Sequence, residues 1–147
     1  MSPPQAPPSA PEDGADPPPG ASGGQGETVL VVEDEELLRD LLARILEDAG
    51  YRPLCAPHAD EAIALVDGGE RPRVLVTDVV MPGMDGRELA RRLLVQVDGL
   101  AVIYMSGYVR RESHAEAELA PGTPFLNKPF APDSLLEHVA AALQAEA

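Results

Sequence analysis

The stretch LVTDVVMPGMDG, residues 75–86, runs an apolar segment into an aspartate, Asp78, and then into a Met-Pro-Gly turn. Its first residues predict a buried strand, because a continuous apolar run is typical of a strand covered on both faces. A carboxylate at the end of such a strand costs free energy unless it is paired, metal-bound or open to water. The surrounding sequence indicates which of these conditions applies to Asp78.

Short apolar runs alternate with amphipathic helical stretches after residue 26. Strands are expected at residues 28–32, 52–56, 73–78, 101–106 and 124–128. Helices are expected at about 37–46, 59–67, 86–97, 111–119 and from 132 onward, with Asp85 as the N-cap of the third and Gly50 after the first. Five strand-then-helix repeats predict an α/β fold, a parallel sheet with helices on both faces.

The first 26 residues differ in composition from the rest of the chain. They contain no Val, Ile, Leu, Phe or Tyr, and they hold eight of the sixteen prolines. Such a segment buries too little apolar surface to offset its ordering entropy. Residues 1–26 are therefore predicted to be a disordered Pro/Gly-rich tail, and residues 27–147 one folded domain.

Charge and apolar content exclude several classes of protein. A net charge of −14 argues against direct nucleic-acid binding, which needs a basic patch. No apolar run approaches the roughly 18 residues of a membrane span, and the N-terminus does not resemble a signal peptide. The single cysteine, Cys55, excludes an internal disulfide and is expected to be a buried, small apolar residue. We expect a cytoplasmic protein without membrane insertion.

Polar side chains stand at the ends of four predicted strands: Glu33 and Asp34, Asp78, Ser106, and Lys128. The carboxyl ends of parallel strands meet at one edge, where ligands bind in α/β sheets. Three carboxylates this close repel one another unless a cation lies among them, and hard oxygen ligands favour Mg2+. Each residue alone also has a plain structural explanation, such as an acidic first helical turn. Their joint placement is what indicates a functional site.

Four motifs carry a resemblance to a known family: VLVVEDE at 29–35, TDVVMPGMDG at 77–86, YMSGY at 104–108 and FLNKPF at 125–130. Over about residues 28–143 the chain resembles a response-regulator receiver domain of two-component signalling. The resemblance implies a flavodoxin-like (βα)5 three-layer sandwich with strand order 2-1-3-4-5. A stand-alone receiver or a receiver of the hybrid-kinase type is expected. The wording of the last two motifs is most similar to receivers of hybrid sensor kinases.

The resemblance also implies a role for each strand-end residue. Asp78 resembles the phosphoacceptor and Lys128 the lysine that pairs with the phosphoryl group. Glu33 and Asp34 resemble the acidic pair that binds Mg2+, with Asp78 and the backbone carbonyl of Val80 as further ligands. Glu33 stands where the family more often has Asp, which is expected to tune Mg2+ binding rather than to abolish it.

Switching and partners are implied in the same way. Ser106 resembles the switch hydroxyl and Phe125 the switch aromatic, although Phe125 lacks the hydroxyl of the tyrosine often found there. The peptide between Lys128 and Pro129 resembles the family's cis peptide. The expected partners are a histidine kinase or histidine phosphotransferase and a downstream protein target.

Two other functions stay open on the sequence. One is a receiver-like interaction module that is never phosphorylated. The other is an aspartyl-phosphate phosphohydrolase, but that chemistry usually places a second acid two residues after the nucleophile, where this chain has Val80. The expectation is a signalling phosphoacceptor whose only catalysis is intrinsic, Mg2+-dependent self-phosphorylation and dephosphorylation.

Overall fold

The computed structural model describes residues 24–81, 83–106 and 124–146. The strands are β1 (Thr28–Val32), β2 (Arg52–Ala56), β3 (Val74–Asp78), β4 (Ala101–Ser106) and β5 (Phe125–Asn127). The helices are α1 (Glu36–Asp48), α2 (Ala59–Asp67), α3 (Gly86–Gln96) and α4 (Pro132–Glu146). The helix expected at 111–119 and most of the N-terminal tail lie outside the described residues.

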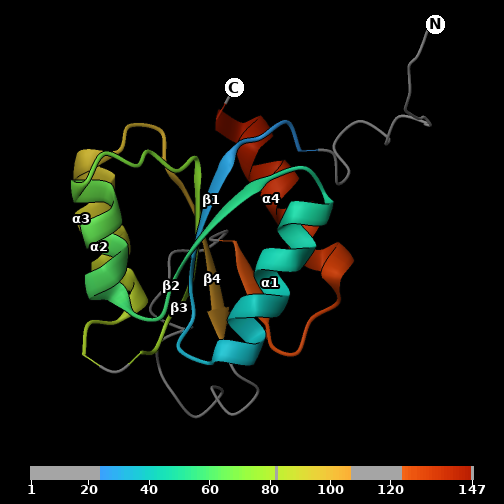
Figure 1. The fold of residues 1–147 in the computed structure, drawn as a ribbon, viewed down its shortest axis with the longest axis horizontal. Helices are drawn as coiled ribbons and strands as arrows, with labels where there is room; N and C mark the ends of the chain where they lie inside the picture. Colours follow the sequence, from blue (N-terminus) through green and yellow to red (C-terminus); the bar gives the residue numbers. More distant parts are fainter. Residues whose placement is uncertain (1–23, 82, 107–123, 147) are drawn as a thin grey trace, which may run out of the picture.

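All five strands form one parallel sheet in the order β2-β1-β3-β4-β5 (Figure 1). Helices α2 and α3 cover one face, and α1 and α4 cover the other (Figure 1). This arrangement confirms the predicted flavodoxin-like α/β sandwich with strand order 2-1-3-4-5.

Two apolar clusters fill the space between the sheet and its helices. Leu30, Leu75 and Leu89 belong to the cluster under α2 and α3, whereas Val31 and Leu42 belong to the cluster under α1 and α4. Successive residues of a strand point to opposite faces, so a central strand contributes to both clusters. This explains why β1 and β3 contain continuous apolar runs, residues 29–32 and 74–76, rather than alternating apolar and polar residues.

One prediction, the burial of Cys55, fails in the edge strand β2. Cys55 in β2 is exposed, so the prediction that it is buried is wrong. Among the described strands β2 pairs with β1 alone, and its side chains between Arg52 and Cys55 are exposed or half-buried. The short apolar run RPLCA does not distinguish an edge strand from a central one.

Helix boundaries follow local sequence signals. The Asp85 side chain accepts a hydrogen bond from the Glu88 backbone N–H at 2.9 Å, which confirms the predicted N-cap of α3. Gly50, with φ of +96°, lies two residues beyond the end of α1. Within the described residues, every helix is too short or too polar to cross a membrane.

Candidate functional site at the carboxyl edge of the sheet

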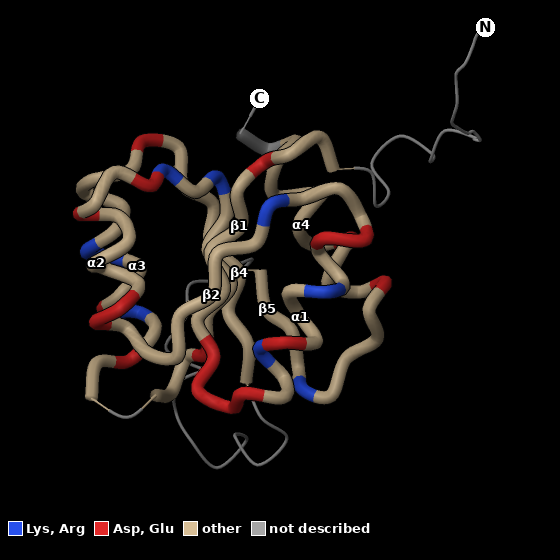
Figure 2. Tube along the Cα trace, in the orientation of Figure 1, with Lys and Arg blue, Asp and Glu red and all other residues tan. Residues whose placement is uncertain are grey.

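The carboxyl ends of the strands bring the predicted polar residues together. Glu33 follows β1, Asp78 ends β3, Ser106 ends β4 and Lys128 follows β5. Glu33, Asp78 and Ser106 are buried, with exposed fractions of 1%, 5% and 4%. Acidic residues gather at this edge, the lower one in Figure 2. Buried polar groups of this kind need partners inside the protein.

Lys128 supplies the partner for two of these buried groups. Its Nζ lies 2.6 Å from Glu33 Oε1 and 2.6 Å from Asp78 Oδ1. The lysine is 95 residues from Glu33 in the sequence, and only 19% of its side chain is exposed. The sequence left Asp78 to be paired, metal-bound or open to water. The structure shows that it is paired with Lys128 through a short charge-assisted hydrogen bond.

Backbone and side-chain hydrogen bonds hold Glu33 in place. Its Oε2 accepts a hydrogen bond from the Glu35 backbone N–H at 2.9 Å. Its own N–H donates to the Ala56 carbonyl at 3.1 Å, and its carbonyl accepts from Arg39 Nη1 at 2.9 Å. Sequence reasoning assigned neither group to the site. Glu35 ends the motif VLVVEDE, but a motif does not show where a backbone amide points, and no motif marks Arg39.

The turn after Asp78 packs tightly against the end of β3. The Val79 N–H donates to the Met105 carbonyl at 2.9 Å, and the Gly86 N–H donates to the Val79 carbonyl at 2.7 Å. A Cβ on Gly86 would lie 2.1 Å from the Asp78 carbonyl oxygen, so only glycine fits there. Sequence reasoning missed this role of Gly86; the glycine directly after the capping Asp85 was the available signal.

The carboxylates of the site have shifted pKa values. Burial raises the pKa of Asp78 to about 7; the nearby Glu33 carboxylate adds to this, while Lys128 opposes it. Burial also disfavours the charged form of Glu33, but hydrogen bonds from Lys128 and the Glu35 amide outweigh it, and the pKa of Glu33 is lowered. Burial disfavours charge on Lys128, but its bonds to Asp78 and Glu33 prevail and its pKa is raised. One ammonium thus faces two buried carboxyl groups.

Three acidic side chains lie close enough to bind one cation. Oxygen atoms of Glu33, Asp34 and Asp78 lie within 4.8 Å of one another. Asp34 is exposed, whereas the other two are buried. An all-oxygen donor set with one side open to water fits Mg2+, which keeps part of its hydration shell. The backbone carbonyl of Val80 as a further ligand stays a prediction; the Val80 side chain is half-exposed.

The predicted switch residues lie on the two strands that precede the lysine, Ser106 at the end of β4 and Phe125 at the start of β5. The Ser106 carbonyl accepts a hydrogen bond from the Lys128 backbone N–H at 2.7 Å, which links β4 to the lysine. Phe125 is opposite Tyr104 in the β4–β5 register and is partly buried against the cluster that contains Tyr104. The Lys128–Pro129 peptide is cis, as the resemblance implies. The switch roles of Ser106 and Phe125 stay predictions.

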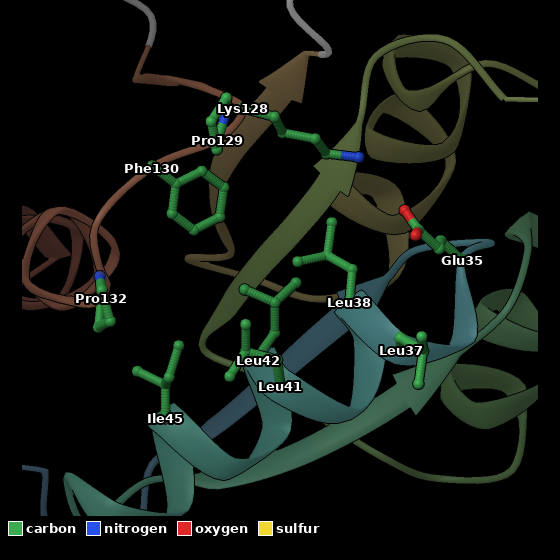
Figure 3. Close-up of a pocket in the computed structure, with 10 residues that line it drawn as sticks. All are labelled: Glu35, Leu37, Leu38, Leu41, Leu42, Ile45, Lys128, Pro129, Phe130 and Pro132. Carbon is green, nitrogen blue, oxygen red and sulfur yellow. The ribbon is translucent and has the colours of Figure 1, made fainter.

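An apolar groove of about 660 Å3 adjoins the lysine (Figure 3). It is lined by Leu37, Leu38, Leu41, Leu42 and Ile45 of α1, by Glu35, and by Lys128, Pro129, Phe130 and Pro132 on the opposite side. Leu37 and Leu41 are 79% and 52% exposed. Large apolar side chains left open beside a polar site are typical of a surface that contacts another protein.

Fold and site together define a flavodoxin-like α/β domain with an acidic pocket at the carboxyl edge of its sheet, and comparison with known proteins identifies its family. Residues 29–140 match the response regulator receiver domain. The chain belongs to this family, which operates in two-component systems.

Relatives and solved structures agree with this assignment. The chain is 40% identical over 113 residues to the uncharacterized 14.6 kDa protein in the sodA1 3′ region of Leptolyngbya boryana, covering 76% of this chain and 86% of that protein. It is 31% identical to the phosphate regulon transcriptional regulatory protein PhoB of Pseudomonas aeruginosa, over 81% of this chain and 52% of PhoB. A response regulator receiver protein from Sinorhizobium medicae has a TM-score of 0.73 at 27% identity, covering 84% and 98% of the two chains. The chain therefore spans about half the length of some curated relatives.

Proposed function

We propose that this receiver domain accepts a phosphoryl group on Asp78 from a histidine kinase or histidine phosphotransferase, in the presence of Mg2+. The observation that carries this proposal is the arrangement of Asp78: a buried carboxylate, 2.6 Å from Lys128 Nζ, within one oxygen cluster that includes the exposed Asp34. A carboxylate in this position combines nucleophilicity with nearby positive charge.

In the proposed step, an Asp78 carboxylate oxygen attacks the phosphorus of a phosphohistidine. An O–P bond forms to Asp78 as the N–P bond of the donor breaks, and the bonding pair stays on the imidazole nitrogen. The chain's own residues position the nucleophile and neutralise charge, which is most of what phosphoryl transfer requires. When bound, Mg2+ would add positive charge against the phosphoryl oxygens, and Glu33, Asp34, Asp78 and the Val80 carbonyl are the proposed ligands.

The aspartyl-phosphate would then act as a switch. The added negative charge and acceptor oxygens offer the Ser106 hydroxyl a new hydrogen-bond partner. Movement of Ser106 would make room for Phe125 to turn inward and change the surface around β5 and α4. A downstream protein that distinguishes the two surfaces would receive the signal.

The groove beside Lys128 supports a protein as the phosphodonor. A small donor needs only the polar pocket, whereas Leu37 and Leu41 expose apolar surface next to it.

The half-exposed Val80 leaves no acid at the position where a phosphohydrolase usually has one, so a phosphohydrolase is not favoured.

Labelling by a small phosphodonor tests the proposal. With acetyl phosphate and Mg2+, intact mass spectrometry should find one added phosphoryl group on the wild type and none on Asp78→Asn. Asp67→Asn is the matched control, because Asp67 is an exposed carboxylate at the end of α2 and does not belong to the cluster of Glu33, Asp34 and Asp78; it should label like the wild type. Equal labelling of wild type and Asp78→Asn would show that the acceptor is another residue.

A further inference from the structure

The strand β2 forms a free edge of the sheet. Among the described strands it pairs with β1 alone, and in Figure 1 this edge faces the viewer, between the helices of the two faces. The outer side of an edge strand presents backbone N–H and C=O groups that can pair with a strand of another molecule. The backbone of β2 therefore decides whether a second copy of this chain could extend the sheet here.

Hydrogen bonds at both ends of β2 show which of its residues face β1. The Arg52 N–H donates to the Glu27 carbonyl at 2.9 Å, and the Ala56 carbonyl accepts from the Glu33 N–H at 3.1 Å. The backbone groups of successive strand residues point to opposite sides of the strand. Every second residue of β2, beginning with Arg52, therefore faces β1, and the residues between them face outward.

The outward-facing positions are Pro53, Cys55 and, directly after the strand, Pro57. A proline nitrogen carries no hydrogen, so it cannot donate to an added strand, and its ring occupies the space where the N–H would lie. Cys55 is thus the one outward-facing residue between positions 53 and 57 that has an N–H. Proline is found in sheets where its nitrogen faces away from the neighbouring strand, and on an edge it opposes pairing with another chain.

The same residues limit how two copies could pair through β2. A twofold axis between the copies would place the two strands antiparallel. With the Cys55 residues opposite each other, this one pair could exchange hydrogen bonds, but on both sides of it a Pro53 would stand opposite a Pro57 without a donor. No other register adds a donor between positions 53 and 57. Strands joined at a single residue pair are not expected to hold together in water.

We propose that Pro53 and Pro57 close the β2 edge to a second copy of this chain, so that the domain cannot grow into a continuous sheet. This inference does not depend on the proposed phosphoacceptor function, and both prolines lie outside the acidic site. The closed edge leaves contacts with other proteins to surfaces formed by side chains, such as the groove along α1.

Cys55 can be observed by itself, because it is the only cysteine in the sequence. Full-length protein labelled with 15N-cysteine gives one backbone amide signal, at the centre of the outward side of β2. The hydrogen exchange of this amide with water, measured under reducing conditions over a range of protein concentrations, reports whether a strand has been added there. In the wild type the Cys55 amide should exchange rapidly at every concentration.

Replacing both prolines with alanine restores their N–H groups without adding apolar surface, because an alanine side chain is smaller than the proline ring. In Pro53→Ala/Pro57→Ala, the Cys55 amide should exchange more slowly as the protein concentration rises. The association constant measured by sedimentation should exceed that of the wild type by about tenfold or more, since each restored donor adds a hydrogen bond between the copies.

Pro132→Ala is the matched control. Pro132 is exposed and is the first residue of α4, where a backbone N–H has no partner inside the helix in any case. The same substitution there should leave association and the exchange of the Cys55 amide as in the wild type. Far-UV circular dichroism and urea unfolding confirm that each variant is folded, and Pro53→Ala and Pro57→Ala alone keep the test available if the double variant does not fold.

Three results would overturn the inference. One is a Cys55 amide in the wild type that exchanges more slowly as the concentration rises, because the edge would then accept a strand despite its prolines. Another is a folded double variant whose Cys55 amide exchanges as rapidly as that of the wild type at every concentration. The third is an equal gain in protection in Pro132→Ala. None of these readouts depends on phosphorylation of Asp78.

Discussion

The two edges of the same sheet carry ion pairs in contrasting environments. At the amino edge, Arg52 at the start of β2 pairs with Glu70 at 3.1 Å, and their side chains are 53% and 33% exposed. At the carboxyl edge, Lys128 pairs at 2.6 Å with Glu33 and with Asp78, whose side chains are 1% and 7% exposed. Water can replace the partner of a charge at the first edge, but not at the second.

The number of charges differs as well as their burial. Arg52 and Glu70 balance each other, whereas one ammonium at the carboxyl edge faces two buried carboxylates and the nearby Asp34. A stable surface pair needs no further ligand. The carboxyl edge carries an excess of negative charge that a cation would relieve, which is a usual property of functional sites.

The largest effect is expected from removal of the shared cation. Lys128→Ala leaves two buried carboxylates without a cationic partner and should lower the free energy of unfolding by about 4 kcal/mol at pH 8 in EDTA. Its Mg2+ affinity should be unchanged or higher, because an internal competitor is gone. Urea unfolding and Mg2+ titration measure these two quantities. A stability equal to that of the wild type, or weaker Mg2+ binding, would contradict the described role of Lys128.

A somewhat smaller effect is expected from the tight turn beneath Asp78. Gly86→Ala introduces a Cβ 2.1 Å from the Asp78 carbonyl oxygen, and the resulting shift should cost about 3 kcal/mol of unfolding free energy. Gly68 caps α2 at the amino edge, and its Cβ would lie 3.3 Å from the nearest atom. Gly68→Ala should therefore change stability by less than about 1 kcal/mol. Thermal and urea unfolding compare the two variants, and equal losses would refute the close contact.

The third effect is an increase in stability rather than a loss, and it concerns the charge of Asp78. Burial raises the pKa of Asp78 from 3.8 to about 7, so the folded protein holds a proton that the unfolded chain releases between these pH values. The stabilisation linked to this proton is complete below pH 4 and is lost as the pH rises to about 7. Asp78→Asn cannot ionise and leaves Glu33 paired with Lys128. In EDTA at pH 8 it should be about 2 kcal/mol more stable than the wild type.

Urea unfolding across pH 4–8 tests whether Asp78→Asn is more stable than the wild type. The difference in unfolding free energy between the two proteins should grow up to about pH 7 and stay constant above it. A difference that shrinks with rising pH would mean that the pKa of Asp78 is lowered. Addition of Mg2+ should stabilise the wild type at pH 8 more than Asp78→Asn, because only the wild type retains all three carboxylates.

The smallest effect is expected at the amino edge. Arg52→Ala removes an exposed pair, so the midpoint of urea unfolding should stay close to that of the wild type. Acetyl phosphate labelling should also be unaffected. If Arg52→Ala lost as much stability as Lys128→Ala, burial could not be the reason why the ion pairs at the two edges differ.

Much of the architecture could be predicted because it depends on local patterns. The unbroken apolar runs at residues 29–32 and 74–76 predict strands covered on both faces, and the structure places β1 and β3 inside the sheet, each between two other strands. The predicted strand bounds differ from the observed ones by a residue at most, as at Arg73, which precedes β3. The exposed Cys55 shows where local reasoning fails, since an apolar run in an edge strand reads like a buried one.

For the site, the sequence determined which residues stand at the strand ends, because a strand of known direction puts its last residues at one edge of a parallel sheet. It did not determine which groups touch. Tertiary structure alone decided that Lys128 reaches Glu33 across 95 residues of sequence, that Asp78 is buried, and that Gly86 leaves room for a carbonyl oxygen. These contacts depend on the order and register of strands far apart in the chain. Periodicity constrains the faces of each strand but carries no information about its neighbours.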